Sequence, residues 1–127
     1  MKKKLLVIDD NDEYRGLIPQ YFSGKGYVVD AACCGREGVE KARLGQPDII
    51  ILDAMMPDLA GVEVLRELQL DELTGAIPVL LVSGHAFDSR IKTFFCQEPN
   101  CRDFLPKTTD LATLHKKIEE CLSRRKE

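Results

Sequence analysis

The sequence predicts an α/β fold of the pattern (βα)5, in which five parallel strands form one doubly wound sheet and alternate with five helices. Two apolar runs, at residues 49–52 and 79–82, are too short for helices and are typical of strands buried on both faces. Segments with helical spacing lie between such runs, and right-handed crossovers leave few other topologies. A length of 127 residues fits one domain, which we expect to extend over residues 1–127.

The first strand, expected at residues 4–9, is followed by a helix with an unusual interior. Asn11 is a suitable N-cap, and two glycines end the helix near residue 23. Gly16 and Pro19 are both unfavourable inside it, because proline lacks the N–H group and its ring clashes with the carbonyl group four residues earlier. We therefore expect this helix to be kinked or shortened.

Cap residues, turn residues and apolar spacing place the remaining elements. Gly45 and Pro47 end the second helix, and Pro99 ends the fourth, for which Asp88 is a possible N-cap. Apolar residues at intervals of three and four give the third and the last helix one apolar face each. The expected strands are 27–32, 49–52, 78–83 and 103–105, and the expected helices are 35–44, 62–70, 88–97 and a last one from about 110.

Charge and cysteine content bear on the class of protein and its partners. The 18 basic and 21 acidic residues give a net charge of −3 without a long basic block, so we expect no nucleic-acid binding by this chain alone. Asp9 and Asp10 interrupt the apolar run near the start, which is therefore too short for a signal peptide or a membrane span. Five cysteines without the spacing of a disulfide framework suit a reducing compartment, and we expect a cytoplasmic protein that does not bind membranes.

Polar side chains follow four of the predicted strands at the point where each strand ends. They are Asp9, Asp10, Asp53, Ser83 and Lys107. The carboxyl ends of parallel strands lie along one rim, where ligands bind in such sheets, although Asp53 could also serve only to end its strand. Two carboxylates about 5 Å apart repel each other by roughly 3 kcal/mol at an effective dielectric constant near 20, and a divalent cation removes that cost. Oxygen ligands favour Mg²⁺ over zinc, and a carboxylate beside it can form an aspartyl phosphate.

The same rim resembles that of a known family. The residues that carry the resemblance are Asp9-Asp10, Asp53 with Met56-Pro57 and Gly61, Ser83 and Lys107. Their order and their places at strand ends are similar to those of the receiver domain of two-component response regulators, which has a chemotaxis-type fold. The resemblance covers essentially the whole chain. It implies the flavodoxin-like strand order 2-1-3-4-5 and a phosphorylation-dependent signalling switch.

The resemblance also implies a role for each side chain at the rim. Asp53 is the expected acceptor of a phosphoryl group from the phosphohistidine of a sensor histidine kinase or a phosphotransfer protein. Lys107 and Ser83 are the expected contacts of the phosphoryl oxygens. The expected Mg²⁺ ligands, with Mn²⁺ as an alternative ion, are the carboxylates of Asp9, Asp10 and Asp53 and the backbone carbonyl group of Met55. Such a domain is not a conventional enzyme, but it catalyses its own phosphorylation and dephosphorylation.

Three further residues match positions that respond to phosphorylation or tune it. Phe104 matches an aromatic switch residue that moves together with Ser83 and changes the surface of the fourth helix, fifth strand and fifth helix; the alternative is an ordinary strand residue. Met55 and His85 match positions that flank the phosphoryl group. As a hypothesis, the apolar side chain of Met55 limits attack by water and lengthens the phosphorylated lifetime. For His85 the alternative is a solvated loop residue.

Two positions depart from the family pattern. Lys107 is usually followed by a proline in a cis bond, whereas here Thr108 follows it and Pro106 precedes it. Because a cis bond before a residue other than proline costs about 3 kcal/mol, we expect the Lys107–Thr108 bond to be trans. Ala60 stands where the family often has an aspartate, which affects only the hydrogen bonding of that loop.

Other interpretations of these patterns remain open. A pseudo-receiver would keep the fold as a protein-interaction module without phosphotransfer, but it has no need for charges that repel one another. A dehalogenase-like hydrolase would place an acid/base aspartate two residues after the nucleophile, where this chain has Met55. The kinase and the output partner, or a missing output domain, are not named by any motif. Cys96 and Cys101 are expected as small buried apolar residues rather than metal ligands.

Overall fold

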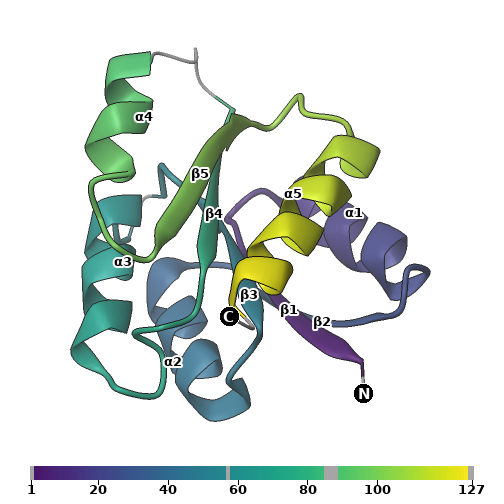
Figure 1. Cartoon of the computed structure of the whole chain (residues 1–127), viewed down its shortest axis with the longest axis horizontal. Helices are drawn as coiled ribbons and strands as arrows, with labels where there is room; N and C mark the ends of the chain where they lie inside the picture. Colours follow the sequence, from purple (N-terminus) through teal and green to yellow (C-terminus); the bar gives the residue numbers. More distant parts are fainter. Residues whose placement is uncertain (1, 57, 85–88, 126–127) are drawn as a thin grey trace.

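The sheet contains five parallel strands in the order β2-β1-β3-β4-β5, as expected. The structure is a computed structural model that describes residues 2–56, 58–84 and 89–125 (Figure 1). The strands are β1 (Lys3–Ile8), β2 (Tyr27–Ala32), β3 (Ile49–Asp53), β4 (Val79–Ser83) and β5 (Cys101–Pro106). The helices are α1 (Asp12–Ser23), α2 (Gly35–Gly45), α3 (Gly61–Leu70), α4 (Ser89–Phe95) and α5 (Leu111–Arg125). Helices α1 and α5 cover one face of the sheet, and α2, α3 and α4 cover the other (Figure 1).

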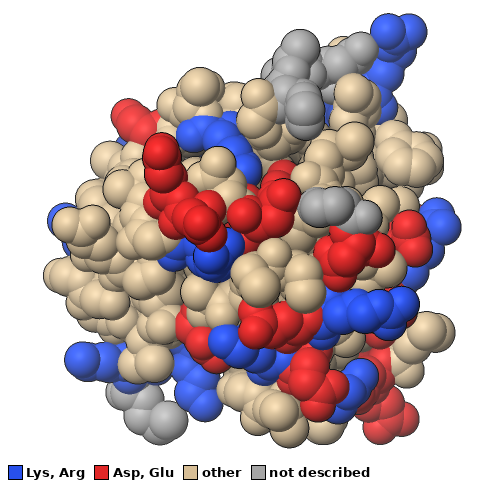
Figure 2. All heavy atoms as spheres, turned by 180° about the vertical axis from the view of Figure 1, so that it is seen from behind, with Lys and Arg blue, Asp and Glu red and all other residues tan. Residues whose placement is uncertain are grey.

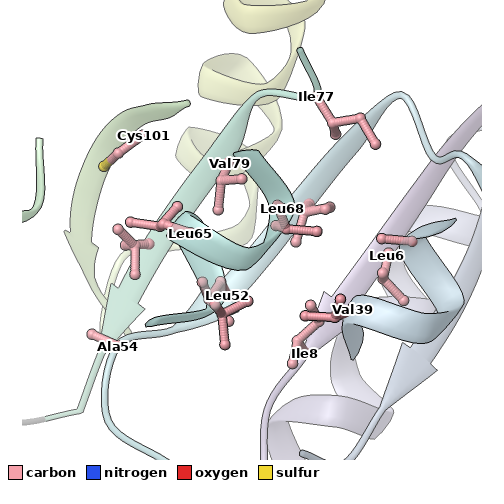
Figure 3. Packing of buried hydrophobic residues seen from close by; sticks show 14 of the residues in the cluster. Leu6, Ile8, Val39, Leu52, Ala54, Leu65, Leu68, Ile77, Val79 and Cys101 are labelled. Atoms are coloured by element: carbon pink, nitrogen blue, oxygen red, sulfur yellow. The ribbon is translucent and has the colours of Figure 1, made fainter. Parts of the chain in front are cut away.

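The middle strands β3 and β4 are buried along their whole length. Their side chains alternate between two apolar clusters, because successive residues of a strand point to opposite faces. Ile50 and Leu52 belong to the cluster between the sheet and α2, α3 and α4, part of which is shown in Figure 3. Ile49 and Ile51 belong to the cluster between the sheet and α1 and α5. The prediction that the two apolar runs are buried parallel strands is confirmed.

Helix α1 is not shortened, so that part of the expectation is wrong. The helix continues from Asp12 to Ser23 through Pro19. Asn11 caps it as predicted, because its Oδ1 accepts a hydrogen bond from the N–H group of Tyr14 at 2.9 Å. The side chains of Ile18 and Phe22 are fully buried in the cluster on this face of the sheet. Their burial outweighs the unfavourable intrinsic preference of proline inside a helix.

The last strand and the fourth helix differ from their expected ranges. Strand β5 begins two residues earlier than expected, because Cys101 pairs with Val79 of β4 before the register shifts by one residue. Helix α4 ends at Phe95 rather than at residue 97. Asp88, the possible N-cap of this helix, lies outside the described residues. In the part of the chain that the structure describes, no helix is long and apolar enough to cross a membrane.

Acidic and basic side chains are interspersed on the face of the molecule that Figure 2 shows. Some charged side chains of the described residues form ion pairs between helices and loops, such as Arg43 of α2 with Asp71 directly after α3 (3.0 Å) and Arg66 of α3 with Glu98 between α4 and β5 (3.3 Å). Exposed pairs of this kind contribute about 0–1 kcal/mol each. The stability of the fold therefore depends on the two apolar clusters rather than on its surface charges.

Candidate functional site

The carboxyl ends of β1, β3, β4 and β5 bring the predicted polar side chains to one rim of the sheet. Ligand oxygens of Asp9, Asp10 and Asp53 all lie within 4.8 Å of one another. Asp9 is 0% exposed and Asp53 is 4% exposed, whereas Asp10 is open to solvent. Asp10 and Asp53 line a polar cavity of about 600 Å³, together with Met55 and Lys107. We call these three carboxylates the acidic cluster.

A glycine determines the path of the loop that follows Asp53. The N–H group of Gly61 donates a hydrogen bond to the carbonyl oxygen of Ala54 at 3.0 Å. A Cβ atom on Gly61 would lie 2.9 Å from the same oxygen, so any larger residue would force the backbone to move. Asp58 in this loop accepts hydrogen bonds from two N–H groups at the start of α2, at 3.1 and 3.2 Å. Ala60 makes no side-chain hydrogen bond as the N-cap of α3.

Lys107 brings an ammonium group to the rim. Its Nζ lies 2.8 Å from Oδ2 of Asp9 and 3.6 Å from Oδ2 of Asp53. The same Nζ lies over the ring of Tyr14, 5.1 Å from the ring centroid. The backbone N–H group of Lys107 donates to the carbonyl oxygen of Ser83 at 2.8 Å, so the ends of β4 and β5 are joined beside the acidic cluster. An ammonium group with two carboxylates and an aromatic face around it has a restricted position.

Tyr14 and Arg15 belong to the rim although no sequence motif predicts them. Nη1 of Arg15 donates a hydrogen bond to the carbonyl oxygen of Asp9 at 3.0 Å, and Tyr14 lies under the ammonium group of Lys107. One sequence feature could have indicated them: they lie three and four positions after the N-cap Asn11. Side chains at these positions of a helix point back toward its start. Which of these side chains reaches the rim depends on how α1 packs on the sheet.

The surroundings of Asp53 favour its protonated form. Burial raises the pKa of Asp53 to about 7; the charge of Asp9 acts in the same direction, and Lys107 and the N–H group of Met55 act against it. That N–H group donates to Oδ1 of Asp53 at 3.2 Å. Burial, together with the charges of Asp9 and Asp53, also raises the pKa of Tyr14, so its phenol is neutral. The positive charge at the rim is therefore too small to keep all of its carboxyl groups ionised near neutral pH.

Oδ2 of Asp9 shows what kind of ion this rim can accept. It is buried, and among the described residues it receives no hydrogen bond; its contact with Lys107 is an ion pair without hydrogen-bond geometry. Its other oxygen, Oδ1, accepts a hydrogen bond from the N–H group of Asn11 at 2.9 Å. Buried carboxylate oxygens are normally satisfied, and three carboxylates beside a polar cavity are a donor set for a hard divalent cation. The residues present therefore fit Mg²⁺.

Phe104 connects the rim to helix α4. Its side chain is 2% exposed, and its ring stacks on that of Phe95 with the centroids 5.3 Å apart and the planes at 25°. Both rings belong to the apolar cluster that Figure 3 shows in part. Phe104 lies on β5, three residues before Lys107, which directly follows the last residue of that strand, so a change at the rim has a short path to α4.

The other predicted site residues have different outcomes. The side chain of Met55 is 57% exposed and lines the cavity beside Asp53; its effect on a phosphoryl group stays a prediction. The function of its carbonyl group as a metal ligand stays a prediction. His85 lies outside the described residues. The Lys107–Thr108 peptide bond is trans, as expected.

The fold and the rim together define a class of protein. It is a doubly wound α/β domain with a candidate cation site at the carboxyl ends of its strands. Residues 5–119 match the family model described as the response regulator receiver domain. The chain belongs to this family, the receiver domains of two-component response regulators.

Individual proteins of the family are similar to this chain over different lengths. Protein PilH of Pseudomonas aeruginosa is 32% identical over 120 residues, which are 94% of this chain and 98% of that protein. The alkaline phosphatase synthesis transcriptional regulatory protein PhoP of Bacillus subtilis is 38% identical over 88 residues, or 69% of this chain, but the match spans only 37% of that protein. A solved response regulator receiver domain protein from Clostridium thermocellum has a TM-score of 0.84 and 26% identity, with 98% of this chain and 97% of that chain covered.

Proposed function

We propose that this receiver domain is a phosphorylation-dependent signalling switch in which Asp53 accepts the phosphoryl group. The donor is a phosphohistidine on a sensor histidine kinase or on a phosphotransfer protein, and we place the domain in the cytoplasm with its partners. The observation that supports this proposal is the position of Lys107 Nζ, 2.8 Å from Asp9 and 3.6 Å from Asp53, beside a polar cavity of about 600 Å³. A cation, a carboxylate nucleophile and open space meet there.

The transfer step makes one bond and breaks another. A carboxylate oxygen of Asp53 attacks the phosphorus atom, the bond between phosphorus and the imidazole nitrogen breaks, and the imidazole leaves with its electron pair. Asp53 must be ionised to attack, and its pKa of about 7 means that added positive charge favours the reactive form. The ammonium group of Lys107 and the hydroxyl group of Ser83 contact the phosphoryl oxygens as charge develops on them.

The acidic cluster would hold the divalent cation that this chemistry uses. The ligands would be the carboxylates of Asp9, Asp10 and Asp53, with the carbonyl group of Met55 as the fourth protein ligand. When bound, Mg²⁺, or Mn²⁺ in its place, supplies positive charge that offsets the repulsion among the carboxylates and neutralises a phosphoryl oxygen. The ammonium group of Lys107, 3.6 Å from Oδ2 of Asp53, would contact a phosphoryl group on that residue.

The output surface in this proposal comprises α4, β5 and α5. Phosphorylation replaces the single negative charge of the Asp53 carboxylate by a phosphoryl group with nearly two negative charges, and this change biases a surface that has two arrangements. Phe104, stacked on Phe95 of α4, lies between the rim and that surface. The output partner would be a separate protein or a further domain of a longer chain.

A protein-interaction module without phosphotransfer is the second candidate function. The buried carboxylates of Asp9 and Asp53 count against it, because buried charge generally lowers stability and a scaffold gains nothing from it. Three neighbouring carboxylates are explained by cation binding, which an interaction module without phosphotransfer does not require.

The deciding experiment is incubation with acetyl phosphate and Mg²⁺, followed by measurement of the intact mass. We expect the addition of one phosphoryl group to the wild-type protein and none to Asp53→Asn. The matched control is Asp12→Asn, because Asp12 lines the same cavity but lies outside the acidic cluster. It should be phosphorylated like the wild type.

Two results would contradict the proposal. Phosphorylation of Asp53→Asn would assign the acceptor to another residue. No phosphorylation of the wild type, in a sample where calorimetry shows bound Mg²⁺, would favour the interaction module.

A further inference from the structure

Two cysteines meet at the junction of α4 and β5, away from the acidic cluster. The Sγ atoms of Cys96 and Cys101 are 3.4 Å apart. Cys96 follows the last residue of α4, and Cys101 is the first residue of β5, where Figure 3 shows it near Val79 and Leu65. All five cysteines of the chain carry free thiols in this structure. The spacing C-x4-C thus corresponds to a close pair of reduced thiols.

The backbone of the intervening turn keeps the two sulfur atoms together. The N–H group of Cys101 donates to the carbonyl oxygen of Glu98 at 3.0 Å. The buried side chain of Asn100 donates to the carbonyl oxygen of Leu65 at 3.0 Å and accepts a hydrogen bond from Gln69 at 2.8 Å, which ties the turn to α3. The contact between the thiols is therefore a property of the folded chain.

The other side of the junction is fixed as well. The N–H group of Cys96 donates to the carbonyl oxygen of Lys92 at 2.9 Å, which continues the hydrogen bonding of α4 by one residue. Phe95, directly before it, is buried and stacks on Phe104 of β5. Both cysteines are thus held by neighbours on either side of the turn.

The two thiols differ in accessibility and in acidity. Cys101 is buried in the apolar cluster, and burial, with further contributions from Cys96 and Asp103, raises the pKa of its thiol. Cys96 is only partly buried. Since thiolates react and buried thiols are protected, a reagent in solution meets Cys96 first. Cys101 then lies in the position of a second thiol that can displace whatever has been attached to Cys96.

We propose that Cys96 and Cys101 form a redox modification site, which a low-molecular-weight disulfide oxidises to an intramolecular disulfide. The Cys96 thiolate attacks one sulfur of the reagent, its S–S bond breaks, and one thiol leaves. Sγ of Cys101 then attacks Sγ of Cys96, and the second thiol leaves with the proton of Cys101. Two protein thiols lose two electrons, and one reagent disulfide is reduced to two thiols.

The geometry allows this bond with a small movement. A disulfide has an S–S distance of about 2.05 Å, so the sulfur atoms have to approach by about 1.4 Å from their separation of 3.4 Å. The register shift after Cys101, at the edge strand of the sheet, is the kind of irregularity that accommodates such adjustments. A metal is a poorer fit, because structural zinc takes four ligands and the cluster of metal-ligating residues found among the described residues is the acidic cluster.

The disulfide would tie the end of α4 to β5. This site does not depend on phosphorylation of Asp53, and it would be reversible in a reducing compartment, where disulfides form transiently. Its effect would be to restrict movement of α4 relative to the strand that carries Phe104.

The test uses the full chain with Cys33→Ser and Cys34→Ser as background, which removes the exposed Cys33 and its neighbour. The protein is treated with oxidised glutathione, alkylated with N-ethylmaleimide and digested with trypsin. Cleavage after Lys92 and Arg102 gives one peptide, residues 93–102, that contains both Cys96 and Cys101. We expect this peptide to lose both alkylation sites, to be lighter by two hydrogens and to carry no glutathione.

Substitution of Cys101 separates the two steps. In Cys101→Ser, the glutathione adduct on Cys96 should accumulate, because no thiol displaces it. Cys101→Ala serves as a second variant if a buried serine disturbs folding, which circular dichroism would show. Full alkylation of both cysteines after treatment of the background protein, or stable glutathione adducts on it, would overturn the proposal.

Discussion

The middle of the sheet and its carboxyl rim are built from the same strands but have opposite energetic requirements. In the middle, Ile51 and Leu52 of β3 are fully buried in the apolar clusters on the two faces. The next residue along the strand is Asp53, whose carboxylate is also buried and lies beside that of Asp9. Burial stabilises the first two side chains and raises the free energy of the charged ones. A single step along β3 thus separates the part that stabilises the fold from the part arranged for chemistry.

This difference implies that stability and reactivity can be changed separately by substitution. Replacing an apolar side chain in the middle should lower the free energy of unfolding. Replacing a polar side chain at the rim should act first on reactivity and on its dependence on pH.

Leu52→Ala should lower the free energy of unfolding by about 2–5 kcal/mol, because it removes a fully buried side chain and leaves a cavity between two packed layers. Urea unfolding followed by circular dichroism measures the change. Leu70→Ala is the matched control, since this leucine is 87% exposed and its replacement should change stability by less than about 0.5 kcal/mol. Equal losses in the two variants would mean that burial in the middle of the sheet is not the source of stability.

Lys107→Met should slow phosphorylation by acetyl phosphate by about 100-fold or more, because it removes a preorganised positive charge from the reacting group. The initial rate is measured from the increase in intact mass with time. Lys41→Met is the control; Lys41 of α2 pairs with Asp30 of β2 at 3.3 Å and does not line the cavity beside Asp53, so its loss should change the rate by less than about twofold. A rate for Lys107→Met close to that of the control would remove Lys107 from the reaction.

The contribution of Asp53 to the free energy of unfolding of the metal-free protein should fall as the pH rises from about 4 to about 7, because the pKa of Asp53 rises from 3.8 to about 7 on folding. Between these values the folded state binds the proton and the unfolded chain does not, so each step up in pH favours unfolding. Above about 7 this contribution is constant. Urea unfolding in a chelator at several pH values should show the slope in the wild type and its loss in Asp53→Asn. If the free energies of unfolding of the wild type and Asp53→Asn change in parallel with pH, a group other than Asp53 causes the pH dependence.

Tyr14→Leu should reduce the phosphorylation rate by about 2- to 30-fold, which corresponds to a cation–π contact of about 0.5–2 kcal/mol between its ring and Lys107. Tyr14→Phe keeps the aromatic face and should retain most of the rate. Both are measured with acetyl phosphate under saturating Mg²⁺. If the phenylalanine variant is as slow as the leucine variant, the hydroxyl group rather than the ring positions the ammonium group.

Met55→Asn should shorten the lifetime of the phosphorylated state by a few-fold, because a polar side chain beside Asp53 can position water where an apolar one excludes it. The decay of phosphorylated protein is followed by intact mass after removal of acetyl phosphate. Met55→Leu keeps the apolar side chain and should leave the lifetime unchanged. Equal decay in all three proteins would end the hypothesis that Met55 protects the phosphoryl group.

The parts of the fold that local pattern determines could be predicted from the sequence. The apolar runs of β3 and β4 and the carboxylates after β1 and β3 required only the rule that parallel strands end at one rim. Pro19 shows where local preference fails, since burial of its neighbour Ile18 outweighs it. The early start of β5 also escaped prediction, because it depends on pairing with Val79, which is distant in the sequence.

In the candidate site, too, the residues that a sequence pattern marks could be predicted, and those that depend on tertiary packing could not. Residues at strand ends converge through topology alone, whereas Tyr14 and Arg15 reach the rim through the packing of α1. The contact between Cys96 and Cys101 depends on a turn that the side chain of Asn100 holds to α3. Spacing in the sequence indicates neither the angle of a helix nor the path of a turn.

The strand order has a consequence for the direction in which a signal leaves the domain. Strand β3 lies between β1 and β4, Asp53 pairs with Val82, and the next N–H group donates to the carbonyl oxygen of Val82 at 2.9 Å. The backbone of Asp53 is thus held on both sides and can move little. Strand β5, which ends directly before Lys107, has a hydrogen-bonded neighbour within the sheet on one side. We therefore expect a perturbation at the rim to move the chain around Lys107, beside this edge strand, more than the backbone of Asp53 at the centre.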